Sequence, residues 1–344
     1  MAGFGAGRPG WKGIALIAAK MALSLGMMVF LFSRIPLASV THALRQADPR
    51  WLAGAAALLL FSNTLGSHQW NRLLHAAGIR IPFWKVFSYY HVGLFFNNFL
   101  PANIGGDLAR VLDASRYGSS RATAFSTVLM DRLVGTVTLA TLALVTTLAI
   151  LFPSPDAPPA LRHFHFPLLY LAVVGFFAFS VTLLWAVLHP ALLPVVERVL
   201  ARVGLGGFGP ALDDLAARLR DFRDQRRLFM ELFSVAVVIQ VARIGVHVLV
   251  AWALGLHVPV LYFFLFVPLL AVIVSVPISL NGIGVREGAG IALFHLVGVG
   301  AGSAFSLQFT TYLVAVAVSM LGGLVFLARM PRRRAAARRQ RRIS

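Results

Sequence analysis

Ionisable side chains inside apolar stretches are the residues of this chain whose types could do chemistry. Asp131 and Arg132 stand in the apolar stretch 124–152, and Arg243 stands near the middle of the stretch 229–256. Charged groups at membrane depth are costly and usually face a bundle interior or a water-filled cavity. A guanidinium without an acidic neighbour in its own helix needs a carboxylate from elsewhere or a phosphate ligand. Arg243 is therefore our first candidate for binding an anionic head group.

Gln240, Arg243 and His247 follow each other at spacings of three and four residues, which places them on one face of a helix. Asp131 and Arg132 are adjacent, so on a helix they point about 100° apart. We therefore expect these two side chains to pair with different elements.

One arrangement pairs Asp131 with Arg286, and Glu287 with either Arg132 or Arg110. For each of these charges, a buried structural ion pair is as plausible as a direct substrate contact.

Two polar segments interrupt apolar stretches and supply the remaining candidates. The first contains Asn97, Asn98, Pro101, Asn103, Gly105, Gly106, Asp107 and Arg110, and the second contains Pro277, Asn281, Gly282, Gly284, Arg286 and Glu287. Backbone that leaves helical geometry inside a bilayer must be buried in protein or line a wet cavity. Glycine permits unusual backbone angles, asparagine supplies donors and acceptors, and the following helix N-termini favour anions. The alternative is that both segments only pack two halves of the protein together.

The elements that position these residues are membrane-spanning helices. Hydrophobic residues make up 58% of the 344 residues and charged residues only 12%, about half the usual charged share of a soluble domain. A spanning helix needs about 20 apolar residues, and six stretches qualify: 14–32, 51–70, 124–152, 166–188, 229–256 and 304–327. Polar and charged residues interrupt segments 84–117 and 261–290, so neither segment crosses the membrane as one continuous helix. We predict an all-α polytopic membrane protein with about six full spans and two re-entrant hairpins.

The distribution of basic residues orients these helices. The chain has 31 basic and 12 acidic residues, and the linker 189–228 and the tail are rich in Arg. With both termini cytoplasmic and the first hairpin re-entrant, 22 basic residues lie inside, four outside and five at membrane depth, as the positive-inside rule requires. The two hairpins then enter from opposite sides. This pattern is typical of an inverted repeat, as found in many secondary transporters.

We therefore divide the chain into one integral membrane domain, 1–330, and a tail, 331–344. The domain contains half-repeats at about 11–153 and 166–329 and the cytoplasmic linker 189–228. The tail is half Arg, and we expect it to be disordered, to fix topology and to touch anionic lipid. No segment is polar enough to form a nucleic-acid-binding domain, so we expect no nucleic-acid partner.

Motif searches find no catalytic or cofactor site. The absence of cysteine excludes disulfides, thiolate zinc sites and cysteine nucleophiles. The chain lacks a phosphate-cradling loop with its lysine, a His-Glu metal helix and a Gly-x-Ser-x-Gly elbow. We expect no enzyme, no cofactor and no metal. An embedded lipid-modifying enzyme that uses Asp131 or Glu287 as a buried base remains an alternative.

Residues 97–110 and 275–288 resemble signature regions of the lysylphosphatidylglycerol synthase transmembrane-region family, also called flippase-like, and the resemblance covers about residues 11–329. In the best-understood members this domain is implicated in moving aminoacylated phosphatidylglycerol between leaflets, and a soluble aminoacyltransferase domain follows it. Other members are associated with hopanoid or polyprenyl-linked glycan pathways. Because the chain ends in its Arg-rich tail, we expect the translocation part without the aminoacyltransferase domain.

We therefore expect a lipid transporter or flippase of the bacterial inner membrane, moving an anionic or polyisoprenoid-type lipid between leaflets. Its expected partners are membrane lipids and, in one alternative, a lipid-biosynthetic enzyme. That alternative is a non-transporting scaffold that presents lipid precursors to the separate enzyme. The sequence makes no prediction of oligomeric state.

Overall fold

The structure is a computed structural model, and it describes residues 37–98, 104–118, 120–152, 166–189, 222, 225–275 and 282–340. All regular structure in these residues is helical, so the predicted all-α class is confirmed. The helices up to the first long gap are α2 (Leu37–Gln46), α3 (Pro49–Ala76), α4 (Phe83–Asn97), α5 (Ile104–Ala114), the short 3-10 helix η2 (Ser115–Tyr117) and α6 (Arg121–Leu151). The later helices are α8 (Pro167–Leu188), α11 (Arg226–Ala253), α12 (Val260–Ser275), α13 (Val285–His295) and α14 (Ala301–Gln340).

Side-chain caps fix where two of the long helices begin. Asp48 accepts a hydrogen bond from the backbone N–H of Arg50 at 2.8 Å, and Pro49 occupies the first position of α3. Ser120 accepts from the N–H of Thr123 at 3.0 Å at the start of α6. Both arrangements satisfy backbone donors that a helix N-terminus leaves free.

Four described helices are long and apolar enough to cross a membrane: α6, α8, α11 and residues Ala301–Ala328 of α14. They include four of the six expected spans. The expected span 14–32 lies outside the described residues. The expected span 51–70 lies within α3, which has 28 residues. It is not among the four because polar side chains such as Asn63 and Gln69 lower the hydropathy of its C-terminal half.

Two pairs of short helices occupy the places of the expected hairpins. Helices α4 and α5 have 15 and 11 residues, and α12 and α13 have 16 and 11. At 1.5 Å per residue, none exceeds about 24 Å, less than the roughly 30 Å of a hydrocarbon core. The connecting segments 99–103 and 276–281 lie outside the described residues, and with them the candidates Pro101, Asn103, Pro277 and Asn281.

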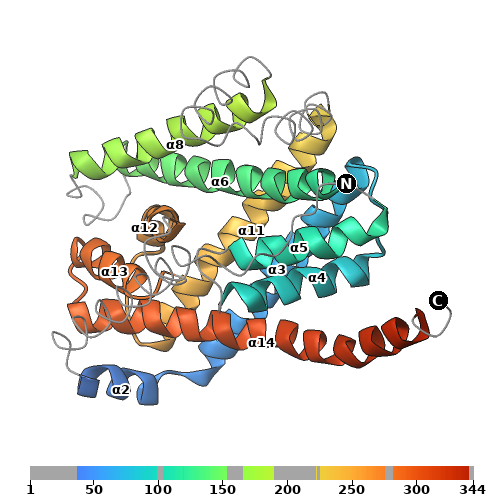
Figure 1. Ribbon diagram of the computed structural model, residues 1–344. Coiled ribbons are helices and arrows are strands. Elements are labelled where there is room, and N and C mark those ends of the chain that lie inside the picture. The colour runs from blue at the N-terminus through green and yellow to red at the C-terminus, as the bar shows by residue number, and fades with distance from the viewer. Residues whose placement is uncertain are drawn as a thin grey trace, which may run out of the picture.

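The α4–α5 and α12–α13 pairs lie between α6 and α14, and α2 lies on the outer side of α14 (Figure 1). Helices α6 and α8 pack against each other along one edge, and α14 runs along the opposite edge. Helices α3 and α11 pack against each other between these edges, while α4 packs on α14 and α5 on both α4 and α6. Phe263, Phe266 and Phe294 form part of a fully buried core between α12 and α13.

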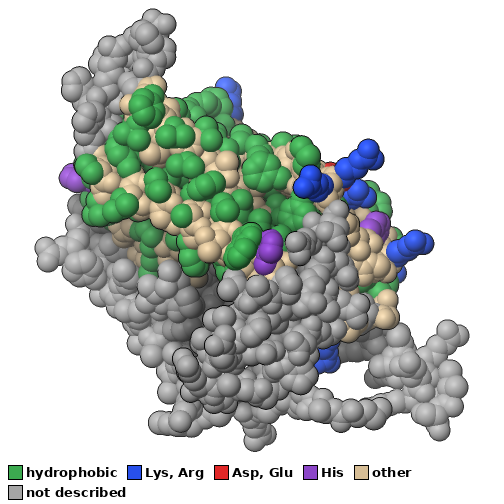
Figure 2. All heavy atoms as spheres, turned by 90° about the horizontal axis from the view of Figure 1, so that it is seen from above, with side chains coloured by type: hydrophobic (Ala, Val, Ile, Leu, Met, Phe, Trp, Pro, Cys, Tyr) green, Lys and Arg blue, Asp and Glu red, His purple; other side chains and the backbone are tan. Residues whose placement is uncertain are grey.

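The face above α8 and α6 is suited to contact lipid. In Figure 2 apolar side chains are the commonest coloured side chains on the described part of this face, and basic side chains lie toward one margin. Leu168, Leu171 and Phe179 of α8 are 80%, 67% and 66% exposed, an exposure that would be unfavourable in water and is favourable against hydrocarbon chains. The described residues therefore support a multi-pass membrane protein.

Helix lengths recur in the same order in two parts of the chain. Helices α3, α4, α5 and α6 have 28, 15, 11 and 31 residues. Helices α11, α12 and α13 have 28, 16 and 11 residues, and the spanning part of α14 has 28. We call α3–α6 the first half and α11–α14 the second half.

The C-terminal tail differs from the disordered segment expected at 331–344. Helix α14 continues without interruption to Gln340. Alanine and arginine are strong helix formers, and extending an existing helix avoids the cost of nucleation. Residues 341–344 lie outside the described part of the chain.

Candidate functional site

A cavity of about 490 Å³ lies between the two halves and receives side chains from α3, α4, α5, α6, α11, α12, α13 and α14. Nine of the candidate residues from the sequence line it: Asn97, Asn98, Asp107, Arg110, Asp131, Arg132, Arg243, His247 and Arg286. Five other candidates lie outside its wall: Gly105, Gly106, Gly282, Gly284 and Glu287. The cavity thus brings together ionisable residues that are up to 179 positions apart in the sequence.

Helices α3 and α11 contribute residues from equivalent positions to the cavity wall. Asn63 lies fourteen residues after the start of α3, and Gln240 lies fourteen residues after the start of α11. Seventeen residues after those starts come Gly66 and Arg243, which also line the cavity. The second half therefore places a guanidinium where the first half has no side chain.

Helices α6 and α14 show the same correspondence. Asp131 and Arg132 lie ten and eleven residues after the start of α6, and Thr311 and Tyr312 lie ten and eleven residues after the start of α14. All four line the cavity. Two charges in the first half thus correspond to two neutral side chains in the second.

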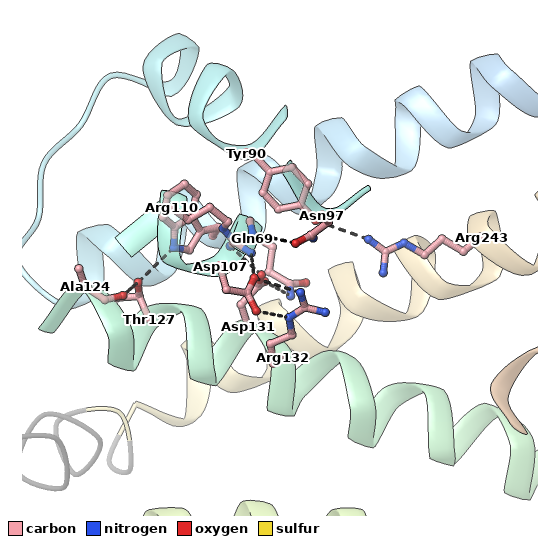
Figure 3. A network of polar contacts seen from close by, with 12 residues as sticks. Gln69, Tyr90, Asn97, Asp107, Arg110, Ala124, Thr127, Asp131, Arg132 and Arg243 are labelled. Carbon is pink, nitrogen blue, oxygen red and sulfur yellow. Dashed lines mark hydrogen bonds and ion pairs between the residues drawn. The ribbon is translucent and has the colours of Figure 1, made fainter. Parts of the chain in front are cut away.

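The first half contains a cluster of ion pairs between α5 and α6 (Figure 3). Arg110 Nη2 donates to Asp131 Oδ2 at 2.8 Å, and Gln69 Nε2 donates to Asp131 Oδ1 at 2.9 Å. Arg132 binds Asp107 in a bidentate pair, with Nε and Nη2 each 3.0 Å from one carboxylate oxygen. Arg110 and Asp107 are also 3.8 Å apart, one helical turn along α5.

This pairing corrects the arrangement proposed from the sequence. Asp131 pairs with Arg110 and Arg132 with Asp107, so both neighbours on α6 find their partners on α5 instead of on different elements. The physical reason is that Asp107 and Arg110, three residues apart, lie on the same face of α5. Because α5 packs against α6, both side chains can reach the adjacent residues Asp131 and Arg132.

The charges of the second polar segment, Arg286 and Glu287, do not reach this cluster. The Arg286 guanidinium lies over the Tyr312 ring, 4.7 Å from its centroid. Glu287 is fully buried, and its Oε2 accepts from the N–H of Gly284 at 2.7 Å, which caps the start of α13. The expected pairs Asp131–Arg286 and Glu287 with Arg132 or Arg110 are therefore wrong.

Two aromatic rings hold Arg110 in place. Its guanidinium carbon lies 4.2 Å from the Trp70 ring centroid and 4.7 Å from the Tyr90 ring centroid. Trp70 is itself fixed by donating from Nε1 to Thr127 Oγ1 at 3.1 Å. Cation–π contacts and an ion pair offset the cost of burying Arg110, which is only 5% exposed. Sequence reasoning missed Gln69, Trp70 and Tyr90, because neutral residues in apolar helices carry no distinctive signal.

Arg243 differs from Arg110 in its surroundings. It projects from α11 into the cavity toward α4 (Figure 3). Among the described residues no carboxylate lies within ion-pair distance of it, and its hydrogen-bond partner is Tyr90 Oη at 3.5 Å. His247 and Gln240 also line the cavity, as their spacing predicts, and Gln240 Nε2 donates to the Gly135 carbonyl at 2.9 Å.

The glycines of the two polar segments differ in backbone conformation. Gly105 and Gly106 belong to α5 and have helical geometry, contrary to the expected unusual backbone angles. Gly106 packs so closely on Gly93 that a Cβ would overlap the Gly93 carbonyl, and its N–H donates to Asn97 Oδ1 at 2.8 Å. Gly282 and Gly284 do have positive φ values of 74° and 82°, as expected for a chain reversal.

The described wall of the cavity carries an excess of positive charge. Four arginines and two aspartates line it, and both aspartates already accept hydrogen bonds on each of their carboxylate oxygens. In a site of low dielectric constant such an excess attracts anions strongly. Within the described residues no cluster of His, Asp and Glu has the composition of a metal site.

Comparison with known proteins shows which sequences this chain is similar to. A family-wide sequence model described as "Lysylphosphatidylglycerol synthase TM region" matches residues 17–323. A "UPF0104 membrane protein" of Pyrococcus horikoshii is 32% identical over 91 residues. That stretch is 26% of this chain and spans 27% of the relative's length.

Proposed function

The chain belongs to the lysylphosphatidylglycerol synthase transmembrane-region family, and on that premise we propose that it is a lipid transporter. It moves an anionic or polyisoprenoid-type lipid between the leaflets of the bacterial inner membrane. The observation that carries this proposal is Arg243, a cavity-lining guanidinium with no ion pair among the described residues. Such a group binds a phosphate well, since phosphate oxygens match the donors of a guanidinium.

The dimensions of the cavity fit a lipid head group. Its volume of about 490 Å³ lies within the range of small-molecule sites, about 300–1,000 Å³. Helices α6, α8, α11 and α14 expose large apolar side chains, so the acyl or isoprenoid chains remain in hydrocarbon while the head group occupies the polar interior. A lipid carried in this way avoids exposing its charge to the bilayer core.

An inverted repeat gives this site access to both leaflets. The α4–α5 and α12–α13 pairs form two re-entrant hairpins that enter from opposite sides, and both termini are cytoplasmic. The matching helix lengths and the equivalent cavity-lining positions of Gly66 and Arg243 support this arrangement. Rocking of one half against the other then exposes the cavity alternately to each side.

Transport is favoured over an embedded enzymatic reaction by the state of the acidic groups. A general base needs a carboxylate within reach of the reacting proton. Asp107 and Asp131 are engaged by arginines and Gln69, and Glu287 caps α13 away from the cavity wall. Among the described residues these are the only acidic groups at or beside the cavity.

Proteoliposomes containing the full chain test the proposal. We expect the protein to accelerate leaflet exchange of dye-labelled phosphatidylglycerol, and Arg243→Ala to slow this exchange about tenfold or more, because a charge-assisted hydrogen bond contributes about 1.5–3 kcal/mol. The matched control is Arg80→Ala, at an exposed position between α3 and α4 outside the cavity. It should exchange lipid at the wild-type rate.

Exchange no faster than in protein-free liposomes, for several anionic lipids and with an imposed membrane potential, would reject the transporter. Stoichiometric co-purification of a lipid-biosynthetic enzyme together with that result would favour the scaffold alternative.

A further inference from the structure

We infer that the cavity accepts head groups that carry a phosphate and no ammonium group, and that it excludes zwitterionic and aminoacylated lipids. This inference deepens the proposed function and rests on it, since it treats the cavity as the lipid site. It also separates this chain from the substrate that the family's name suggests, because a lysylated head group carries two ammonium groups.

The first step concerns the carboxylates, which are the usual partners of an ammonium group. The described wall of the cavity carries two, Asp107 and Asp131. All four of their oxygens accept a hydrogen bond from Arg132, Arg110 or Gln69 at 2.8–3.0 Å. Each of these oxygens could accept a second hydrogen bond, but an ammonium group that reached either carboxylate would lie beside the guanidinium already bound to it, and the two cations would repel each other.

The second step concerns the aromatic rings, which can bind ammonium groups through their π faces. The tyrosines on the described wall are Tyr90 and Tyr312. Arg110 covers a face of Tyr90, and Arg286 covers a face of Tyr312, each 4.7 Å from the ring centroid. Each ring therefore already has an arginine of this chain against one of its faces.

The third step is the balance of charge. Four arginines face two aspartates across the described wall, and Glu287, buried next to Arg286 behind the wall, adds a third negative charge. The remaining positive charge repels an added cation and attracts an added anion. Arg243 strengthens this difference because its contact among the described residues is the neutral Tyr90 hydroxyl. Phosphatidylglycerol brings one negative charge, phosphatidic acid up to two, and lysyl-phosphatidylglycerol a net positive charge.

The test compares lipids that share acyl chains and differ only in head group. Detergent-purified full-length protein is titrated with short-chain phosphatidylglycerol, phosphatidic acid, phosphatidylethanolamine and lysyl-phosphatidylglycerol, and binding is measured by native mass spectrometry. We expect the first two to bind at least tenfold more tightly than the last two. Equal binding of phosphatidylglycerol and lysyl-phosphatidylglycerol would overturn the inference.

A gain of ammonium binding is the sharper prediction. Arg132→Gln removes both donors from Asp107 and leaves its carboxylate facing the cavity, while Arg110 keeps its bond to Asp131. We expect the preference for phosphatidylglycerol over lysyl-phosphatidylglycerol to fall about tenfold.

The matched control is Arg72→Gln, which breaks a bidentate pair with Glu231 at 2.6 and 2.7 Å outside the cavity. Arg72 is about as exposed as Arg132, 42% against 49%. Its variant should keep the wild-type preference, and the same preference in both variants would contradict the inference.

Binding and transport separate the two possible failures. If no lipid crosses the bilayer in proteoliposomes while phosphatidylglycerol binds selectively, the transporter proposal fails and the head-group preference holds. If both lipids bind and cross equally, transport holds and the preference is wrong.

Discussion

Arg110 shows at the scale of one residue how a buried charge organises the first half. It contacts Asp131, Trp70 and Tyr90 at once, and these come from three different helices. A guanidinium that lost this carboxylate would keep only its 3.8 Å contact with Asp107 and its two aromatic rings in a medium of low dielectric constant. The cluster therefore specifies how α3, α4, α5 and α6 fit together, and Arg243 takes no part in its ion pairs.

Asp131→Asn tests this role. We expect the free energy of unfolding to fall by about 3–5 kcal/mol, because the substitution leaves Arg110 buried beside a neutral amide. Urea or SDS titration of the purified protein, followed by circular dichroism, measures the change. Arg72→Gln is the control, since its pair with Glu231 is about 40% exposed and an exposed pair contributes about 1 kcal/mol or less. A loss for Asp131→Asn no larger than the control's would argue against a structural cluster.

Helix α4 shows at the scale of an element how glycines allow close packing. Gly66 of α3 faces Tyr90, Gly106 of α5 faces Gly93, and Gly322 of α14 faces the backbone of His91. Small residues are common at such helix contacts because they let two backbones approach. Helix α4 is thus held on three sides, and its cavity-lining residues Tyr90 and Asn97 are fixed by neighbours that have no side chains.

Gly322→Ala tests this packing. The new Cβ would overlap the His91 carbonyl, so α4 and α14 must separate. We expect a loss of stability of about 1–3 kcal/mol, together with slower lipid exchange, measured by thermal denaturation and the proteoliposome assay. Gly175→Ala on α8 is the control, because nothing lies within 4 Å of its Cβ position. It should leave stability unchanged or raise it by up to about 1 kcal/mol. Equal behaviour of both variants would refute the close contact.

The whole molecule combines two similar halves with different charges. Equivalent positions hold Gly66 and Arg243 on α3 and α11, and Arg132 and Tyr312 on α6 and α14. The first half neutralises its own charges, and the second half directs Arg243 and Arg286 to the shared cavity. The two halves thus have helices of similar lengths but line the cavity with different side chains.

Topology provides the test at this scale. Because the chain has no cysteine, single cysteines report accessibility without background. Arg80→Cys and Arg121→Cys flank the α4–α5 pair, and His257→Cys and Gly300→Cys flank the α12–α13 pair. We expect the first two to be labelled from the cytoplasmic side and the last two from the opposite side, by a membrane-impermeant maleimide on intact cells and inverted vesicles. Arg80 and Arg121 on opposite sides would rule out the re-entrant hairpin.

That this is an all-α membrane protein could be predicted from the sequence, because this class depends on the length and apolarity of each segment by itself. Apolar length determines which helices can cross a bilayer, and the spans expected at 124–152, 166–188, 229–256 and 304–327 are present as α6, α8, α11 and α14. The spacing of Gln240, Arg243 and His247 likewise placed them on one helix face, and all three line the cavity. The cost of burying a charge singled out Asp131, Arg132 and Arg243 before any contact was known.

Only the tertiary structure decided which charges neutralise one another. Asp131 pairs with Arg110 and not with Arg286. Arg132 pairs with Asp107 and not with Glu287. Tyr90 contacts both Arg110 and Arg243. The pairing of these charges depends on how α5 lies between α4 and α6, and the close contact of Gly93 with Gly106 sets the position of α5 on α4. Ion pairing requires side chains within about 4 Å in space, and a sequence pattern specifies the face of each helix without specifying its neighbour. The cavity's surplus of positive charge arises because the packing of these helices brings four arginines and two aspartates to one wall.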